Sequence, residues 1–176
     1  MEFYQSHWIL TFLIFFPAVA AVAAFASGEE NAKRVALGAG IVELLVSLPL
    51  FWTYSPGSSC QQPTALGAAP GMPQETLPVA MSNCAAIPWI EQWGISYRIG
   101  LDGISLFMVL LTTLLLPLMV LGSWTYIRDR QRLFYAMLLV LTGAVVGVFV
   151  ALDLFLFYVF FEVGLIPMYF LIGVWG

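Results

Sequence analysis

Charged side chains are scarce in this chain of 176 residues. Asp, Glu, Lys and Arg together make up 9% of it, against about 25% in an ordinary soluble domain. Hydrophobic residues supply 61%, and the mean hydropathy is +0.95. A soluble fold of this size needs more polar side chains to cover its surface. The composition therefore excludes a disordered chain and a nucleic-acid-binding module, and it predicts an integral membrane protein.

Motifs of catalytic and cofactor chemistry are also missing. The chain has one His and two Cys, and its sequence contains no phosphate-binding glycine loop, no Ser–His–Asp set and no ligand pattern for haem or a cluster. A single His gives no basis for a metal site. We expect this chain to bind no cofactor, no metal, no nucleic acid and no soluble small-molecule substrate.

Long apolar runs fill most of the sequence. A helix needs roughly 20 apolar residues at 1.5 Å each to cross about 30 Å of hydrocarbon. Five runs are long enough, and we see no strand-like alternation that competes with a helical interpretation. The expected spans are residues 7–26, 35–54, 104–125, 133–152 and 154–175. The predicted fold is an all-α membrane protein, with helices in residues 1–54 and 101–176 and an outer-side loop at 55–100.

The basic residues lie in two islands, residues 27–34 and residues 126–132, with Arg98 alone elsewhere. Cytoplasmic loops carry the Lys and Arg excess, so both islands should face the cytoplasm and the N-terminus should lie outside. The Arg-rich second island is predicted to be a solvated turn, with contact to a partner subunit or anionic lipid as the alternative. Residues 24–26 resemble a signal-peptide cleavage site, but the first six residues contain no Lys or Arg, so an uncleaved helix is favoured.

The segment 55–100 is rich in Pro, Gly, Ser and Ala, a composition typical of an extended surface segment. Its tryptophans Trp89 and Trp93 suit a membrane–water interface. Both cysteines, Cys60 and Cys84, lie in this segment, and the expected topology puts them on the side where disulfides form. A Cys60–Cys84 bridge and two free thiols both remain open, because the sequence does not fix the distance between them.

Glu162 is the strongest candidate for function. It lies eight residues into the last span, about 12 Å deep, and an ionisable residue in hydrocarbon costs about 2.5 kcal/mol or more on insertion scales. Tyr158 shares its helix face, and Pro167 leaves the carbonyl of Val163 without its helical donor. A carboxylate beside such a carbonyl favours a proton path. The alternative is a protonated side chain that only hydrogen-bonds between helices.

Glu43 is a second carboxyl group at similar depth, and the sequence names no partner for it. A place on the proton path and a merely structural hydrogen bond are both open. Pro117 marks a kink in the third span, where a water-lined bend competes with an ordinary tolerated kink. Asp102 and Asp153 stand at the starts of spans and are predicted to be N-caps, with a proton-exit role as the alternative.

Three stretches, residues 94–106, 147–157 and 161–176, resemble the chain M family of the bacterial proton-pumping NADH:quinone oxidoreductase, respiratory complex I. The resemblance covers about residues 94–176. It implies the N-terminal part of an antiporter-like bundle in the bacterial inner membrane, packed against other complex I membrane subunits and lipid. It also implies that Glu162 pairs with a lysine on a later helix. NADH, FMN, iron–sulfur clusters and quinone would be held by partner subunits.

The chain departs from this family in length, because family members continue well beyond Gly176. None of the six basic residues lies inside an expected span, so these residues alone do not supply the lysine partner. We therefore expect a fragment of a longer subunit. The alternatives are a subunit of a multisubunit sodium/proton antiporter or membrane-bound hydrogenase, and a truncated structural or assembly subunit.

Overall fold

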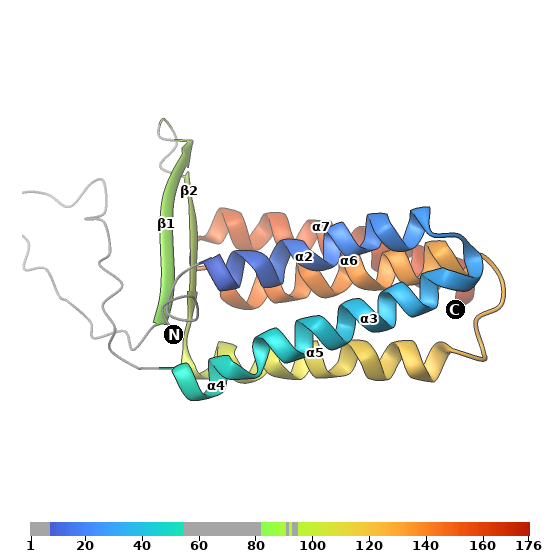
Figure 1. The fold of residues 1–176 in the computed structure, drawn as a ribbon. Coiled ribbons are helices and arrows are strands. Elements are labelled where there is room, and N and C mark those ends of the chain that lie inside the picture. Colours follow the sequence, from blue (N-terminus) through green and yellow to red (C-terminus); the bar gives the residue numbers. More distant parts are fainter. Residues whose placement is uncertain (1–7, 55–81, 91, 93–94) are drawn as a thin grey trace, which may run out of the picture.

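The computed structural model describes residues 8–54, 82–90, 92 and 95–176, and its main feature is a set of long apolar helices. Five of them, counting one helix that is interrupted near its end, have the length and composition to cross a membrane, which confirms the expected number. They run side by side along one common direction (Figure 1). In chain order the helices are α2 (Trp8–Ala26), α3 (Glu29–Ser47), its continuation α4 (Pro49–Thr53), α5 (Gly103–Ser123), α6 (Gln131–Val150) and α7 (Leu154–Trp175).

The second span differs from its expected bounds. Helix α3 begins at Glu29 instead of Val35, so most of the first basic island is helical. Two acidic residues, Glu29 and Glu30, occupy its first turn, where negative charge stabilises a helix. At the other end the helix is interrupted before Pro49, because proline has no N–H to donate to the carbonyl of Leu45.

Helix α6 is the central element, since it packs against α2, α3, α5 and α7. Small residues allow this close packing. A Cβ atom on Gly143 would lie 2.6 Å from the Ile14 carbonyl oxygen of α2, and one on Gly147 would lie 2.6 Å from the Phe160 ring of α7. The two glycines form a G-x-x-x-G pattern that is typical of close helix contacts in membranes. Gly143 allows the close approach of α2, and Gly147 allows that of α7.

The buried apolar residues form two clusters, one in each half of the bundle. The cluster nearer the start of α2 includes Ile9, Leu10, Leu50, Val109 and Val150. The other includes Ala24, Ala36, Leu116, Val120 and Leu139. Along the helices, the gap between the clusters contains the buried polar residues of the bundle: Glu43, Ser47, Thr113 and Thr142. The polar side chains therefore form a layer near the middle of the spans.

A β-hairpin lies across one end of the bundle, a feature that the sequence analysis missed by treating residues 55–100 as an extended segment. Strands β1 (Ser82–Ile90) and β2 (Ile95–Leu101) are antiparallel (Figure 1). The backbone N–H of Leu152 donates to the carbonyl of Arg98 over 2.9 Å, and Ile99 is buried against the bundle. The signal was present, because apolar and non-apolar residues alternate through residues 95–101.

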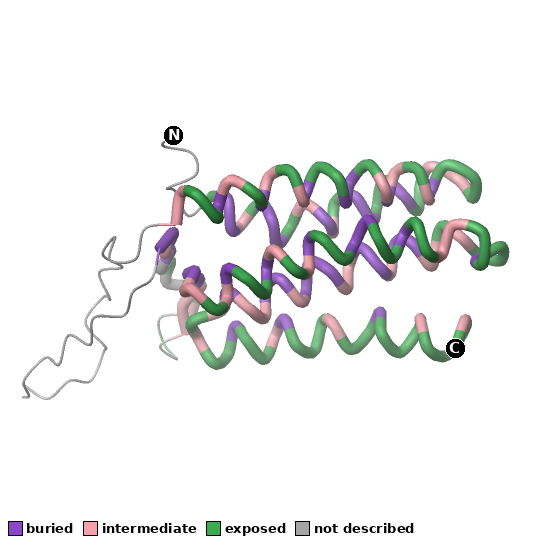
Figure 2. The backbone as a smooth tube through the Cα atoms, turned by 90° about the horizontal axis from the view of Figure 1, so that it is seen from below, coloured by how far each residue is buried: buried purple, intermediate pink, exposed green. Residues whose placement is uncertain are grey.

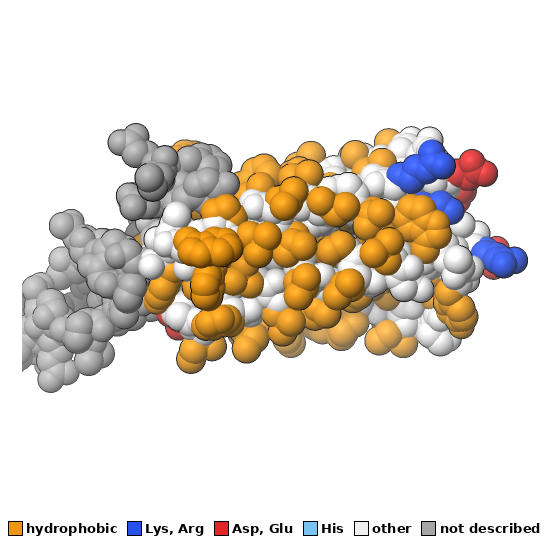
Figure 3. All heavy atoms as spheres, turned by 60° about the horizontal axis from the view of Figure 1, so that its bottom comes forward, with side chains coloured by type: hydrophobic (Ala, Val, Ile, Leu, Met, Phe, Trp, Pro, Cys, Tyr) orange, Lys and Arg blue, Asp and Glu red, His pale blue; other side chains and the backbone are white. Residues whose placement is uncertain are grey.

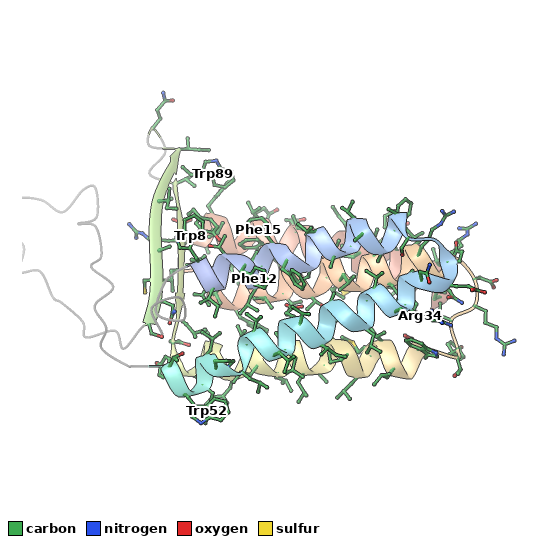
Figure 4. The ribbon with its side chains drawn as sticks, in the orientation of Figure 1. Trp8, Phe12, Phe15, Arg34, Trp52 and Trp89 are labelled. Carbon is green, nitrogen blue, oxygen red and sulfur yellow. The ribbon has the colours of Figure 1, made fainter. Side chains whose placement is uncertain are left out.

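Lys and Arg side chains gather at the end of the bundle opposite the hairpin, and the face drawn in Figure 3 is broadly apolar between the two ends. At the charged end, the Arg132 Nε lies 3.1 Å from a carboxylate oxygen of Glu29. At the hairpin end lie Trp8, Trp52 and Trp89, while Arg34 lies at the opposite end (Figure 4). Tryptophan is present at the charged end too, where Trp175 contacts Asp129. Aromatic residues at both ends and basic residues concentrated at one are typical of a membrane-spanning bundle.

Candidate functional site

Helix α7 places Glu162 on the face that turns away from α6. The helix begins at the N-cap Asp153, whose carboxylate accepts from the backbone N–H groups of Phe155 and Leu156 at 2.9 and 3.3 Å. Phe160 and Gly164 pack against α6, Gly164 with its Cβ position 3.5 Å from Ala144. Glu162 is two residues from each, and two residues rotate a helix face by about 200°. Its side chain is accordingly exposed.

Two tyrosines share this face with Glu162. Tyr158 precedes it by four residues, one helical turn away on the same face. Tyr169 follows by seven residues, and the two rings are 56% and 75% exposed. Pro167 is buried in the same helix and leaves the carbonyl of Val163 without its helical donor. The face thus presents one carboxyl group and two phenols, and the described part of the chain leaves it uncovered.

Glu43 has the opposite environment. Its side chain is fully buried, and neither carboxyl oxygen has a hydrogen-bond partner among the described residues. Gly40, one turn before it, packs against α5, where an added Cβ would lie 3.2 Å from Leu116 and 3.3 Å from Pro117. One turn after it, the Ser47 hydroxyl lies 2.7 Å from the Thr113 hydroxyl. Glu43 therefore leaves α3 on the face that packs against the Thr113–Pro117 turn of α5.

The structure thus brings Glu43 and Pro117 to one helix interface, but it does not join Glu43 to Glu162. Helix α6 packs against both α3 and α7. Measured along each helix from the hairpin end, Glu43 is ten residues from Thr53 and Glu162 is eight from Leu154, or about 15 and 12 Å. The two carboxyl groups share a depth but belong to different surfaces, one internal and one external.

The remaining sequence candidates lie near the bundle ends. Asp102 caps α5 through a 2.6 Å hydrogen bond from the backbone N–H of Ser105. Cys84 lies on β1 and is disulfide-bonded, whereas Cys60 lies outside the described residues. In the second basic island, Arg132 contacts Glu29, and the Trp175 indole donates to the carbonyl of Asp129 over 3.0 Å. This turn therefore joins α3, α6 and the end of α7.

Sequence reasoning did not identify the Ser47–Thr113 contact or the role of the two α6 glycines. The G-x-x-x-G spacing of Gly143 and Gly147 was visible and could have indicated a close helix contact. The hydroxyl pair had no comparable signal. It depends on the register between α3 and α5, which the sequence does not state.

The sequence of this chain is similar to sequences of known proteins. A sequence profile for NADH-ubiquinone oxidoreductase chain 4, amino terminus, matches residues 74–148. Subunit M of the NADH-quinone oxidoreductase of Rhodobacter capsulatus is 41% identical over 175 residues, covering 96% of this chain and 30% of the relative. The chain belongs to the subunit M/chain 4 family. It corresponds to the N-terminal region of that family and spans about 30% of the length of such a relative.

A second relative and a solved structure are also similar to this chain. Subunit M of the NADH-quinone oxidoreductase of Escherichia coli K12 is 51% identical over 90 residues, which are 51% of this chain and 18% of the relative. A chain of the respiratory complex I of Thermus thermophilus, solved with bound NADH, has the same fold, with a TM-score of 0.72 at 24% identity over 95% of this chain and 29% of that chain. The fold of that complex I chain therefore extends over nearly the whole sequence.

Proposed function

We propose that this chain acts within an antiporter-like subunit M of a proton-translocating NADH:quinone oxidoreductase, where it contributes Glu162 to proton translocation. Membership of the subunit M family carries the proposal. The structural support is a carboxyl group about 12 Å along an apolar helix, on a face that the described residues leave open. A charged residue within a membrane helix is expensive and marks an ion pathway by default.

Glu162 requires a cationic partner from outside the described part of this chain. The described Lys and Arg residues lie at the two ends of the bundle: Lys33, Arg34, Arg128, Arg130 and Arg132 at one end, and Arg98 on the hairpin. We propose that the later part of a full-length subunit covers the open α7 face and places a lysine against Glu162. A change in that pair's separation would then move the carboxyl group between its charged and neutral forms.

The redox chemistry belongs elsewhere in this proposal. The described residues contain no cluster of three or more His, Cys, Asp or Glu side chains that could hold a metal. NADH, FMN, iron–sulfur clusters and quinone would be bound by partner subunits, and the membrane subunits among them would contact this bundle. The residues of this chain would supply proton binding and helix packing only.

The proposal is tested with Glu162→Gln in the intact complex. The expected result is a severe loss of protons translocated per NADH oxidised, while NADH oxidation by the peripheral part of the complex persists. Glu30→Gln is a matched control, because it removes the same charge from an exposed position at the charged end. Proton translocation at the wild-type level in Glu162→Gln would contradict the proposal.

We also propose that the charged end faces the bacterial cytoplasm and the hairpin faces outward. The basic residues at one end and the disulfide-bonded Cys84 at the other support this orientation. A membrane-impermeant thiol reagent should label Gln92→Cys from outside the cell and Asp129→Cys only in inverted vesicles. Labelling of Asp129→Cys from outside would reverse the assignment.

A further inference from the structure

We propose that Glu43, the Ser47–Thr113 hydroxyl pair and the backbone carbonyl of Thr113 form a second proton-binding site inside the membrane, at the interface of α3 and α5. The ligand is a proton, held by the carboxyl group together with water that bonds to the neighbouring oxygens. The inference rests on the proposed function, and it adds to Glu162 a separate group in a different part of the bundle.

The position of Glu43 between two fixed contacts is the first support. Gly40 and Ser47 flank it at one turn on either side, and both touch α5, at Pro117 and at Thr113. Residues three and four apart lie on one helix face. Side chains in a helix also lean toward its N-terminus, so the Glu43 carboxyl group leans from its own turn toward the level of Gly40 and Pro117. This lean brings it to the level of Pro117, where the continuous helix α5 lacks one backbone hydrogen bond.

The missing hydrogen bond leaves one backbone acceptor. Pro117 has no N–H, so the carbonyl of Thr113 lacks its helical donor. The side-chain hydroxyl of Thr113 does not compensate, because it donates to the carbonyl of Leu110, 3.1 Å away. An unpaired carbonyl in the membrane interior is satisfied by a neighbouring side chain or by water. A protonated carboxyl group and bound water are suitable donors.

The hydroxyl pair can respond to a proton. The Ser47 and Thr113 hydroxyl oxygens are 2.7 Å apart, and either can be the donor. Each hydroxyl also has a backbone acceptor, Leu44 at 2.9 Å for Ser47 and Leu110 at 3.1 Å for Thr113. Two hydrogens serve these three bonds, so one of the three is always unmade. The direction of the bond between the two hydroxyls can therefore reverse. Such a pair accepts a hydrogen bond in one state and relays it in the other.

No cation stabilises a charged Glu43 in the described part of the chain. Among the described residues of the elements packed against α3, the helices α2, α4 and α5 contain no ionisable side chain. Helix α6 contains Arg132, which pairs with Glu29, and Tyr135, whose hydroxyl accepts from Ser123. On α3 itself, the nearest cation is Arg34, nine residues away, or about 14 Å. An unpaired buried carboxylate is far more costly than a hydrogen-bonded neutral carboxyl group, so the site takes up a proton at rest.

The test uses the intact complex in membranes and two measurements. Glu43→Gln should lower the number of protons translocated per NADH and should remove one protonated-carboxyl band from the infrared spectrum. The band should shift in deuterium oxide in the wild-type protein. Glu30→Gln, which changes the same charge on the same helix at an exposed position, should change neither measurement. Wild-type translocation in Glu43→Gln overturns the inference.

A second variant provides a test in case the complex that carries Glu43→Gln does not assemble. The double change Ser47→Ala and Thr113→Val leaves the carboxyl group in place and removes both hydroxyls. It should shift the protonated-carboxyl band to higher frequency, and an unchanged band overturns the inference. Disappearance of the band on adding sodium chloride, but not potassium chloride, would also overturn it in favour of a sodium site.

The two proposals fail separately. If Glu162→Gln loses proton translocation and Glu43→Gln does not, only the second site is wrong. If Glu162→Gln pumps normally, the proposed function fails, while the infrared band still reports whether Glu43 binds a proton.

Discussion

Helices α6 and α7 are consecutive in the sequence and similar in hydropathy, yet they are buried to very different extents in the bundle. Both are strongly apolar, but 56% of the apolar stretch of α6 is buried and only 11% of that of α7. In Figure 2 the helix that carries the C-terminus is exposed over most of its length. Hydropathy selects both segments as spans, but it does not distinguish an internal helix from a peripheral one.

The difference follows from small residues and from contacts on several sides. Helix α6 brings Gly143 within reach of α2 and Gly147 within reach of α7, so its backbone lies close to both. Helix α7 offers one packed side, through Phe160 and Gly164, and leaves Glu162 on the other. An enclosed helix holds the layers of the bundle together, while a one-sided helix keeps an ionisable group available to another part of a complex.

The largest expected effect comes from breaking the contact between these two helices. Gly147→Leu places a side chain where a Cβ alone would lie 2.6 Å from the Phe160 ring. Overpacking of this kind should lower the free energy of unfolding by about 3 kcal/mol. The check is thermal unfolding of this chain in detergent. Gly122→Leu is the control, because no atom lies within 4 Å of its Cβ position apart from its chain neighbours and the backbone of its own helix. Equal losses in both variants would show that the contact is unimportant.

A direct comparison of the two environments gives the next effect. Leu139 of α6 is fully buried, whereas Ile172 of α7 is 65% exposed. Leu139→Ala should cost about 2 kcal/mol, because it leaves a cavity, and Ile172→Ala should cost about 0.5 kcal/mol or less. Denaturation of the same isolated chain in detergent measures both. A larger loss for Ile172→Ala would mean that α7 packs more extensively than the structure shows.

The helix starts differ in a third, smaller way. Helix α7 has a side-chain cap in Asp153, while the N-cap residue of α6 is Arg130, which has φ 50° and makes no side-chain hydrogen bond to the helix. Asp153→Ala should therefore lower stability by about 1 kcal/mol through two uncapped N–H groups. Asp153→Asn keeps an oxygen acceptor and should lose much less. Faster amide hydrogen exchange in the first turn of α7, confined to the alanine variant, would locate the effect.

The smallest effect concerns the hairpin that pairs with the connection between α6 and α7. Burial raises the pKa of the Tyr97 hydroxyl above its ordinary 10.0, while its hydrogen bond with Thr11 acts in the opposite direction. A raised pKa in the folded state means that the stabilisation is complete below about pH 10 and is lost as the pH rises through the folded value. Tyr97→Phe should remove this alkaline loss of stability.

Thr11→Val sharpens the same measurement. Removing the hydroxyl partner deletes the contribution that lowers the Tyr97 pKa, so the absorbance of tyrosinate should appear at still higher pH. An unchanged titration would show that the 3.4 Å contact between Thr11 and Tyr97 has no energetic role.

Much of the helical fold was predictable, because each span is long, apolar and separated by polar residues. The start of α3 was misjudged since Glu29 and Glu30 looked like loop residues, although acidic residues suit a first helical turn. The hairpin was missed because the glycine- and proline-rich context outweighed the alternation in residues 95–101. For the candidate site, depth singled out both Glu162 and Glu43, but the sequence gave no partner for either.

By itself, the sequence determined the membrane class, the number of spans and the two intramembrane carboxyl groups, because hydrophobicity and helix rise are local properties that add along the chain. The tertiary structure alone decided that Glu43 is enclosed against Thr113 and Pro117 while Glu162 faces outward. That difference depends on helix rotation and on register between α3 and α5, and between α6 and α7. These are set by close contacts at residues such as Gly40, Gly147 and Gly164, which lie far apart in sequence from their partners.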